Sequence, residues 1–410
     1  MAVGLLETSA PRVRAGSGRA LHVVHLIEAL GPGGAERLLY TNLKHFDPAR
    51  VRSTVFTVYP RSDHWGGAIR ELGVEVIGLG CRGPRDLPRA GLRLRSWLRS
   101  ERPHLLHTHL WGANVVGRFA GRLSGVPVVS SMHGLDYEPE TWNDGSGVSL
   151  RKRRLIRLVD RWMARFCSAR IVAVSDSVRR SAHRHLRYPL GRMDLLYNPV
   201  DVDEFRPPAG GEREEVLGEL GLPADSLLLL NVGHVIPAKG LLYAIRALPS
   251  VLKGHPAAHL VSVGALNSPE WLALLRGEAE SLGVAGHVHI LGPRRDVPRL
   301  LRACDLFVFP SLHEGLGIAL IEAMASGRAC VAAESGPLPE VVEHGKSGWL
   351  VSPRDAEGLA EAISMLLSDP SLRASLGRAA RETTLDRFQP RRAADRLVEI
   401  YESVAGAGRN

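Results

Sequence analysis

Short apolar runs that alternate with helix-length segments constrain the fold of this chain most strongly. Each run is four to eight residues long and is bounded by Gly, Pro or Asp. This pattern is typical of βαβ units whose parallel strands are buried on both faces. The predicted strands are Leu21–Ile27, Val51–Val58, Val74–Ile77, His104–Thr108, Val126–Ser130, Arg170–Val174, Met193–Tyr197, Leu227–Val232, His259–Val263, His287–Leu291, Leu306–Phe309, Ala329–Ala332 and Gly348–Val351.

Thirteen strands exceed one ordinary doubly wound sheet, so the pattern predicts two domains. Pro, Gly and charged residues cluster in Asn198–Glu215, between the seventh and eighth strands. We expect an α/β fold in which two Rossmann-like parallel-sheet domains face a central cleft, with ligand at the carboxyl ends of the strands. The expected boundaries are a flexible tail (1–18), an acceptor-side domain (19–204), a donor-binding domain (205–388) and a C-terminal helix that returns to the first domain (389–410).

The charge of the chain is unevenly distributed. Its 410 residues carry a formal charge of +9, but residues 1–205 sum to +12 and residues 206–410 to −3. A protein surface that binds polyanions uniformly is therefore not expected. No nucleic-acid motif is present, and aromatic residues make up 5% of the chain, so base-stacking platforms are sparse.

No apolar run is long enough to span a membrane, and the first twenty residues lack the pattern of a secretory signal. The four cysteines are widely spaced within or beside apolar sequence, which favours buried free thiols over a disulfide or metal site. These features predict a cytoplasmic protein.

Several short motifs resemble known sites but lack the necessary context. Gly78–Gly83 matches G-x-G-x-x-G, yet prolines follow it instead of an immediate helix start; Gly345–Ser347 lacks the first glycine of a phosphate-binding loop. Asp201 and Asp203 could bind a metal, but inter-domain turn chemistry is the preferred interpretation. His107 and His109 lie at a strand end, and we expect them to point to opposite sides and to bind no common metal.

Two glycine-containing loops each follow the first strand of a domain. Gly31–Arg37 opens a helix, where free N–H groups favour anions. Asn231–Gly240 leads into another helix, and Lys239 stands at its entrance. A lysine beside glycine at such a turn suits phosphate binding, although a solvated lysine is an equally simple interpretation.

Two further segments carry candidate chemistry. Glu314 lies in a loop after the apolar strand Leu306–Phe309, and Glu322 lies inside the following helix. A continuous helix would separate the two by roughly 12 Å and rotate them by about 80°, so they suit two anchors of an elongated ligand, not an acid/base pair. His133 ends the strand Val126–Ser130, at the expected cleft.

With these residues, the chain resembles retaining glycosyltransferase family four, which has the GT-B fold. The resemblance covers approximately residues 20 to 390. Glu314 and Glu322 form the Glu-x7-Glu arrangement within FPSLHEGLGIALIEAMASG. Further matching segments occur in the family's order: GPGGAERLL, HTHLWGAN, SMHG, VAVSDS, NPVDVDEF, VGHVIPAKG and ESGPLPEVV.

The resemblance implies metal-independent transfer of a sugar from a UDP- or GDP-type donor, with retention and without a cofactor. It implies that Glu322 binds the ribose, Glu314 the donor sugar and Lys239 the diphosphate, with His133 at the reaction centre. Catalytic candidates are thus His133, Lys239 and Glu314. The donor-binding set adds Gly33, Gly34, Gly233, His234, Gly315, Leu316, Gly317 and Glu322. His109 and Asn114 are acceptor-side candidates, and no metal ligand is expected.

One position departs from the family pattern. His234 stands where the family has a phosphate-binding arginine. Either His234 supplies a weaker, pH-dependent charge or another arginine replaces it, and donor affinity or donor identity can change accordingly.

The acceptor is expected to be a lipid-linked saccharide or another glycan precursor. Leu150–Phe166 is a basic amphipathic segment, and Leu150–Arg170 could reach an anionic membrane surface, which would make the enzyme peripheral on the inner face. The slightly preferred alternative packs the apolar face of Leu155, Val159, Trp162, Met163 and Phe166 into the core. Another GT-B enzyme (an epimerase or phosphorylase) and a basic anionic-surface or nucleic-acid module are the remaining functional alternatives.

Overall fold

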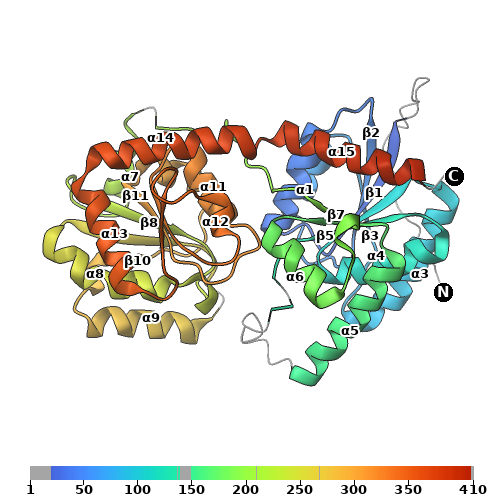
Figure 1. Ribbon diagram of the computed structural model, residues 1–410, viewed down its shortest axis with the longest axis horizontal. Coiled ribbons are helices and arrows are strands. Elements are labelled where there is room, and N and C mark those ends of the chain that lie inside the picture. The colour runs from blue at the N-terminus through green and yellow to red at the C-terminus, as the bar shows by residue number, and fades with distance from the viewer. Residues whose placement is uncertain (1–19, 136, 139–148, 209, 267, 408–410) are drawn as a thin grey trace. The chain divides into compact units, whose positions relative to one another are not determined.

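The computed structural model describes residues 20–135, 137–138, 149–208, 210–266 and 268–407. The predicted tail (1–18) lies outside the described residues. The described chain divides into two compact units: the first comprises residues 20–131, 162–171 and 394–407, and the second comprises 132–161 and 172–393 as far as they are described. Figure 1 shows the elements of each unit.

Two parallel sheets form the framework, one of seven strands in the order β3-β2-β1-β4-β5-β6-β7 and one of six in the order β10-β9-β8-β11-β12-β13. Both orders reverse direction beside the first strand, as in Rossmann-like folds. The strands are β1 (Leu21–Ile27), β2 (Val51–Thr57), β3 (Glu75–Gly78), β4 (Leu105–His109), β5 (Val128–Met132), β6 (Arg170–Ala173), β7 (Met193–Leu195), β8 (Leu227–Val232), β9 (Ala258–Val263), β10 (Val288–Ile290), β11 (Leu306–Phe309), β12 (Cys330–Ala333) and β13 (Trp349–Val351).

Helices connect the strands, because a parallel strand pair requires a crossover. They are α1 (Gly34–His45), α2 (Gly66–Glu71), α3 (Leu87–Glu101), α4 (Trp111–Ser124), α5 (Leu150–Cys167), α6 (Asp176–Leu186), α7 (Glu212–Glu219), α8 (Leu241–Gly254), α9 (Pro269–Ser281), α10 (Val297–Ala303), α11 (Ile318–Ala325), α12 (Leu338–Val341), α13 (Ala356–Ser368), α14 (Pro370–Arg387) and α15 (Pro390–Ala407).

The α/β fold with two Rossmann-like parallel sheets is confirmed. Every predicted strand is present, and the bounds shift by no more than two residues at either end. The predicted linker Asn198–Glu215 ends too late, because α7 already begins at Glu212. Its run of acidic residues near the helix start suits the helix dipole, which explains why a charge cluster here is helical.

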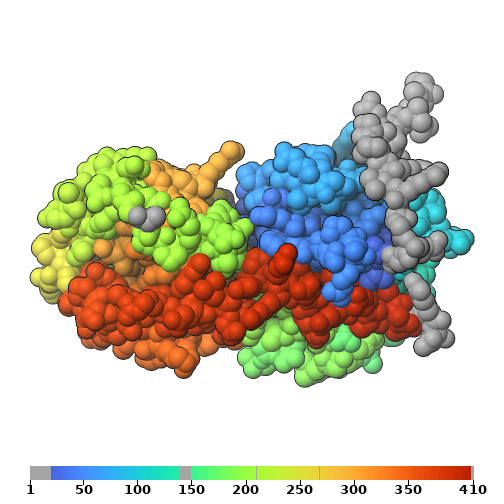
Figure 2. Space-filling view, turned by 90° about the horizontal axis from the view of Figure 1, so that it is seen from above, coloured from blue at the N-terminus to red at the C-terminus, as the bar shows by residue number. Residues whose placement is uncertain are grey.

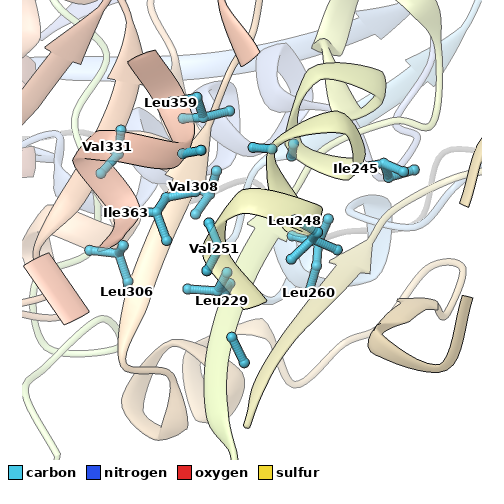
Figure 3. Close-up of a cluster of buried hydrophobic side chains, with 14 of the residues drawn as sticks. Leu229, Ile245, Leu248, Val251, Leu260, Leu306, Val308, Val331, Leu359 and Ile363 are labelled. Carbon is cyan, nitrogen blue, oxygen red and sulfur yellow. The ribbon is translucent and has the colours of Figure 1, made fainter. Parts of the chain in front are cut away.

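The core of the second unit lies between the six-stranded sheet and its covering helices (Figure 3). Leu229 of β8 and Val308 of β11 pack with Leu248 of α8 and Ile363 of α13, and all four side chains are buried. This packing fixes the strand ends from which the candidate site is built.

The last helix, α15, packs on the first unit. The hydroxyl of Tyr401 lies 2.6 Å from Nδ1 of His107 in β4, and Arg50 forms an ion pair of 2.9 Å with Glu402. Figure 2 shows the dark red surface of α15 beside the blue surface of the first unit. None of the described helices is both long enough and apolar enough to cross a lipid bilayer.

Candidate active site

Lys239 and Glu314 form the centre of the candidate site in the second unit. The Nζ atom of Lys239 donates to Oε1 of Glu314 at 2.7 Å, and both side chains are mostly withdrawn from solvent. Lys239 ends a short 3₁₀ turn after β8, and Glu314 lies in the loop after β11. Because β8 and β11 are neighbouring parallel strands, their carboxyl ends deliver both groups to the same edge of the sheet.

Backbone bonds hold the two loops together. The carbonyl oxygen of Ala238 accepts from the N–H of Leu312 at 2.8 Å and from Ser311 Oγ at 3.3 Å. Gly240 has a φ of +68°, and a Cβ there would clash with the carbonyl oxygen of Pro310. Glycine at 240 is therefore required both by conformation and by close approach. The neighbouring loops position Lys239 and its partner before any ligand binds.

Asn231, near the end of β8, supports the two loops that carry Lys239 and Glu314. Its side-chain amide donates to the carbonyl oxygen of Val308 at 2.9 Å, and its Oδ1 accepts from Ser262 Oγ at 3.2 Å. The amide thus connects β8, β9 and β11 where these strands end. Beyond it, Gly233 passes close to Gly264, at which a Cβ would clash with the carbonyl oxygen of Gly233. The sequence pattern places Asn231 at the start of this glycine-containing loop but predicts no role for it.

The helix after Glu314 begins later than a continuous-helix estimate assumes. Gly317, with a φ of +94°, precedes α11, so the stretch from Glu314 to Gly317 is not helical. The helical separation of roughly 12 Å and 80° therefore does not apply to Glu314 and Glu322. The two carboxylates remain on different elements, one in a loop and one on α11. Glu322 is buried, with 7% of its surface exposed, on a helix that is otherwise apolar.

The residues between the two glutamates differ in what they offer a ligand. Leu316 is buried in the core, so its backbone and not its side chain can contribute. Gly315 belongs to the same compact unit as His133, and a Cβ at Gly315 would clash with the carbonyl oxygen of His133. The structure thus brings His133 to the backbone of the Glu314 loop. Burial lowers the pKa of His133 to about 4, so its imidazole is neutral at pH 7.

The charges of Lys239 and Glu314 both influence the pKa of His234. Burial lowers its pKa, the positive charge of Lys239 lowers it further, and the negative charge of Glu314 opposes both effects. The neutral imidazole is therefore favoured at neutral pH. Unlike an arginine, His234 supplies a hydrogen-bonding group there and not a permanent charge.

The glycine loop of the first unit has a different environment. Gly33 caps α1 through its backbone, and a Cβ there would clash with the carboxylate of Glu36. Burial raises the pKa of Glu36, and the nearby Glu28 raises it too. An acidic side chain thus lies beside Gly33 at the start of α1, and its charge would oppose the approach of a phosphate.

Both acceptor-side candidates are buried in the first unit. His109 and Asn114 are 1% and 4% exposed. Asn114 Oδ1 accepts from Thr108 Oγ1 at 2.6 Å, which ties α4 to β4. These positions favour structural roles. Between the two lies Leu110, a non-glycine residue with a φ of +72°, followed by the exposed Trp111. The sequence pattern does not predict the positive φ of Leu110, because leucine carries no signal for this backbone conformation.

The prediction that His107 and His109 point to opposite sides is wrong. Residues two apart on a strand share a face, and their ring centroids are 4.1 Å apart. The turn interpretation of Asp201 fits the structure, since its Oδ1 accepts from the N–H groups of Asp203 and Glu204 at 3.1 Å. Lys346, in the rejected phosphate-loop match, forms an exposed ion pair with Glu343.

Helix α5 exposes most of its apolar face. The apolar residues whose surfaces are 44–61% exposed are Leu150, Leu155, Leu158, Val159, Trp162 and Phe166. Met163 is buried, so packing of the whole predicted face into the core is wrong for the other four residues of that face. Arg154 and Arg165 are exposed on the same helix. A helix with this pattern offers apolar and cationic groups to solvent together.

Comparisons with known proteins identify the family of the chain. The family described as Glycosyltransferase Family 4 matches residues 32–204, and the family described as Glycosyl transferases group 1 matches residues 212–383. The chain is 30% identical over 324 residues to alpha-maltose-1-phosphate synthase of Mycolicibacterium smegmatis, covering 75% of this chain and 80% of the relative.

A second relative and a solved structure extend the comparison. The chain is 25% identical over 350 residues to the Escherichia coli UDP-Gal:alpha-D-GlcNAc-diphosphoundecaprenol alpha-1,3-galactosyltransferase, covering 83% of this chain and 86% of the relative. The Anabaena protein HepE, solved in complex with UDP and glucose, superposes with a TM-score of 0.81 at 22% identity, covering 93% of this chain and all of that one. At this identity the structural match supports the fold.

Proposed function

Because the chain belongs to glycosyltransferase family 4, we propose that it transfers a sugar with retained configuration from a UDP- or GDP-type donor to a glycan or lipid-linked acceptor. Glycosyltransferase activity of the GT-B type follows from the family. The donor class, the stereochemistry and the acceptor are parts of the proposal. The observation that carries it is the Lys239–Glu314 pair at the adjoining ends of β8 and β11.

The Lys239–Glu314 pair suits a nucleotide sugar because such a donor carries two chemically different groups, a diphosphate and a sugar. Its diphosphate gains negative charge as the bond to the sugar breaks, and a fixed ammonium stabilises that charge. Its sugar hydroxyls can donate to a carboxylate. On donor binding, Lys239 and Glu314 would each exchange part of their mutual bond for the diphosphate and the sugar, respectively. Their loops are already fixed, so this exchange needs little reorganisation.

We assign the remaining donor contacts as the family resemblance implies. Glu322, a buried carboxylate on α11, would accept from the ribose hydroxyls. The backbone from Gly315 to Gly317 would face the phosphates. His133, neutral at pH 7, would lie beside the donor sugar. The diphosphate would be neutralised by Lys239 and backbone N–H groups, and the reaction would need no divalent metal.

The acceptor side of the proposal rests on α5. Its exposed aromatic pair, Trp162 and Phe166, has ring centroids 5.5 Å apart, and arginines flank the apolar stripe. Such a helix can lie in the interface of an anionic membrane. The Escherichia coli relative is named for a diphosphoundecaprenol-linked acceptor, which supports a lipid-linked acceptor here. We therefore propose a cytoplasmic enzyme that is peripheral on the inner membrane face.

A thermal-shift comparison tests the donor class. Wild-type protein is incubated with UDP, GDP and ADP, with a single-stranded oligonucleotide of matched phosphate concentration as the control. The proposal predicts that one diphosphate stabilises the protein and that Lys239→Ala removes this effect. Stabilisation by the oligonucleotide alone would instead favour a polyanion-binding module.

A further inference from the structure

Three buried histidines on neighbouring strands of the first unit form a cluster that the proposed reaction does not use. His25 lies on β1 and His107 and His109 on β4, and the strand register pairs His25 directly with His107. The three side chains are 0–1% exposed. Their ring centroids are 4.1 Å apart for His107 and His109, and 5.7 and 5.9 Å from His25 to these two rings.

The spacing of the ring nitrogens matches a metal site. One nitrogen of each histidine lies within 4.8 Å of those of the other two, and no other triad of His, Cys, Asp or Glu in the described parts of the chain meets this criterion. A tetrahedral zinc ion holds nitrogens at about 2.0–2.1 Å and therefore about 3.3 Å from one another. Small side-chain rotations would close the difference.

His25 shows the chemical need for a ligand most clearly. Its Nδ1 is buried and has no hydrogen-bond partner among the described residues, while its Nε2 lies 3.4 Å from Ser53 Oγ. A buried ring nitrogen without a hydrogen-bond partner is costly, and coordination of a metal ion would satisfy it.

Hydroxyl groups orient the cluster as the outer shell of a metal site does. His107 Nε2 lies 2.8 Å from Ser131 Oγ, and His107 Nδ1 lies 2.6 Å from the hydroxyl of Tyr401. Metal binding would therefore take the nitrogen that now contacts one hydroxyl, while the other hydroxyl accepts from the remaining ring nitrogen and orients the imidazole. Tyr401 comes from α15, so the cluster lies where the C-terminal helix meets the sheet.

We propose that His25, His107 and His109 form a structural site for a borderline transition-metal ion such as Zn²⁺. The ion is held by three imidazole nitrogens, with the Tyr401 hydroxyl as the oxygen next to the site, and it fastens α15 to β1 and β4. The donor chemistry proposed above does not depend on it.

Metal content tests the site in full-length protein without a polyhistidine tag. After removal of loosely bound metal with a chelating resin, elemental analysis should find one equivalent of zinc per chain, or the chain should take up one equivalent of added Zn²⁺. Co²⁺ alone should give the visible absorption bands of a tetrahedral site, and excess Zn²⁺ should abolish them. Absence of both uptake and bands in folded wild-type protein would overturn the proposal.

Two ligand variants, one variant of a neighbouring hydroxyl and a matched control assign the ligands. His25→Leu and His109→Leu should each weaken Co²⁺ binding by more than about tenfold, and Ser131→Ala by about tenfold. His22→Gln changes a buried histidine of the same strand whose Nε2 contacts Thr54 instead, and it should keep the full equivalent. Circular dichroism checks folding. If the leucine variants fold and bind Co²⁺ like wild type, the assignment is wrong; if they do not fold, the wild-type measurement decides.

Discussion

The ammonium of Lys239 and the carboxylate of Glu314 lie 2.7 Å apart although 75 residues separate them in the sequence. The contact exists because β8 and β11 are adjacent and because Ala238 ties their loops together. Each group thereby keeps the other oriented at the edge of the sheet. A donor that carries both an anion and hydroxyl groups can engage both partners.

Removal of either partner should reduce the transfer rate. We expect Lys239→Ala and Glu314→Ala to lower kcat/KM by at least about tenfold, because each variant loses charge stabilisation or sugar positioning. Lys346→Ala is the matched control, since it removes a lysine from an exposed ion pair with Glu343. Initial rates and circular dichroism are measured for all three. Wild-type rates in a folded Lys239 or Glu314 variant would refute the site assignment.

His234 should make nucleotide affinity depend on pH. Its pKa is lowered in the free protein, so the imidazole is neutral at pH 7 and gains charge only as the pH falls. A bound diphosphate favours the charged form, so UDP or GDP should bind more tightly at pH 6 than at pH 8. His234→Arg carries a permanent charge and should bind more tightly at pH 8 with a flatter profile. Calorimetric titration at both pH values measures this; a wild-type profile as flat as that of the variant would exclude the role.

Glu322 should act on the ribose. We expect Glu322→Gln to raise the KM of the donor by about tenfold, because a charged acceptor for the ribose hydroxyls is replaced by a neutral amide. The 2′-deoxy and 3′-deoxy forms of the bound nucleotide provide the control. Wild type should lose affinity for at least one of them, whereas the variant should discriminate less. Equal discrimination by both proteins would place Glu322 away from the ribose.

Acid should destabilise the protein through buried histidines. Burial lowers the pKa of His22 to about 4 and that of His25 to about 3. In the unfolded chain both titrate near 6.5, so stability is greatest above that pH and is lost as the pH falls toward the folded values. Between pH 7 and 5 the loss is at most about 2 kcal/mol per histidine. In metal-free protein, His25→Leu should make the thermal midpoint less sensitive to pH over this range, and an unchanged dependence would contradict the assignment.

Membrane binding should depend on the apolar stripe of α5. The double variant Leu158→Ser/Trp162→Ser removes two side chains that are about 60% exposed, so folding should be little affected. Binding to vesicles that contain anionic lipid should weaken by at least about tenfold, because buried apolar area drives insertion. Leu274→Ser on α9 is the control, since this leucine is also exposed. Failure of wild type to bind such vesicles at low salt would end the membrane proposal.

The sequence predicted the two sheets well because strands buried on both faces leave continuous apolar runs. It also proposed Lys239 and Glu314 as site residues, although the contact between them depends on strand adjacency, which periodicity does not report. It placed Glu314 in a loop and Glu322 in the following helix, but its estimate of their separation used a continuous helix, because the positive φ of Gly317 is not visible in the pattern. The histidine cluster was missed because His25 becomes a neighbour of His107 only through the register of β1 and β4.

The exposed face of α5 shows a further limit. An amphipathic pattern reveals that an apolar face exists but not whether protein or solvent covers it. Here Met163 is buried whereas Trp162 is exposed, and only the structure distinguishes them.

The anomeric configuration of the first-formed product tests the proposed transfer with retained configuration. Wild-type enzyme is incubated with each common α-configured UDP- and GDP-sugar, and proton NMR follows the released sugar or glycoside before mutarotation. We expect that one donor is consumed, that its product appears first as the α-anomer, and that Lys239→Ala abolishes the signal. A product that appears first as the β-anomer, or consumption of none of these donors, would contradict it.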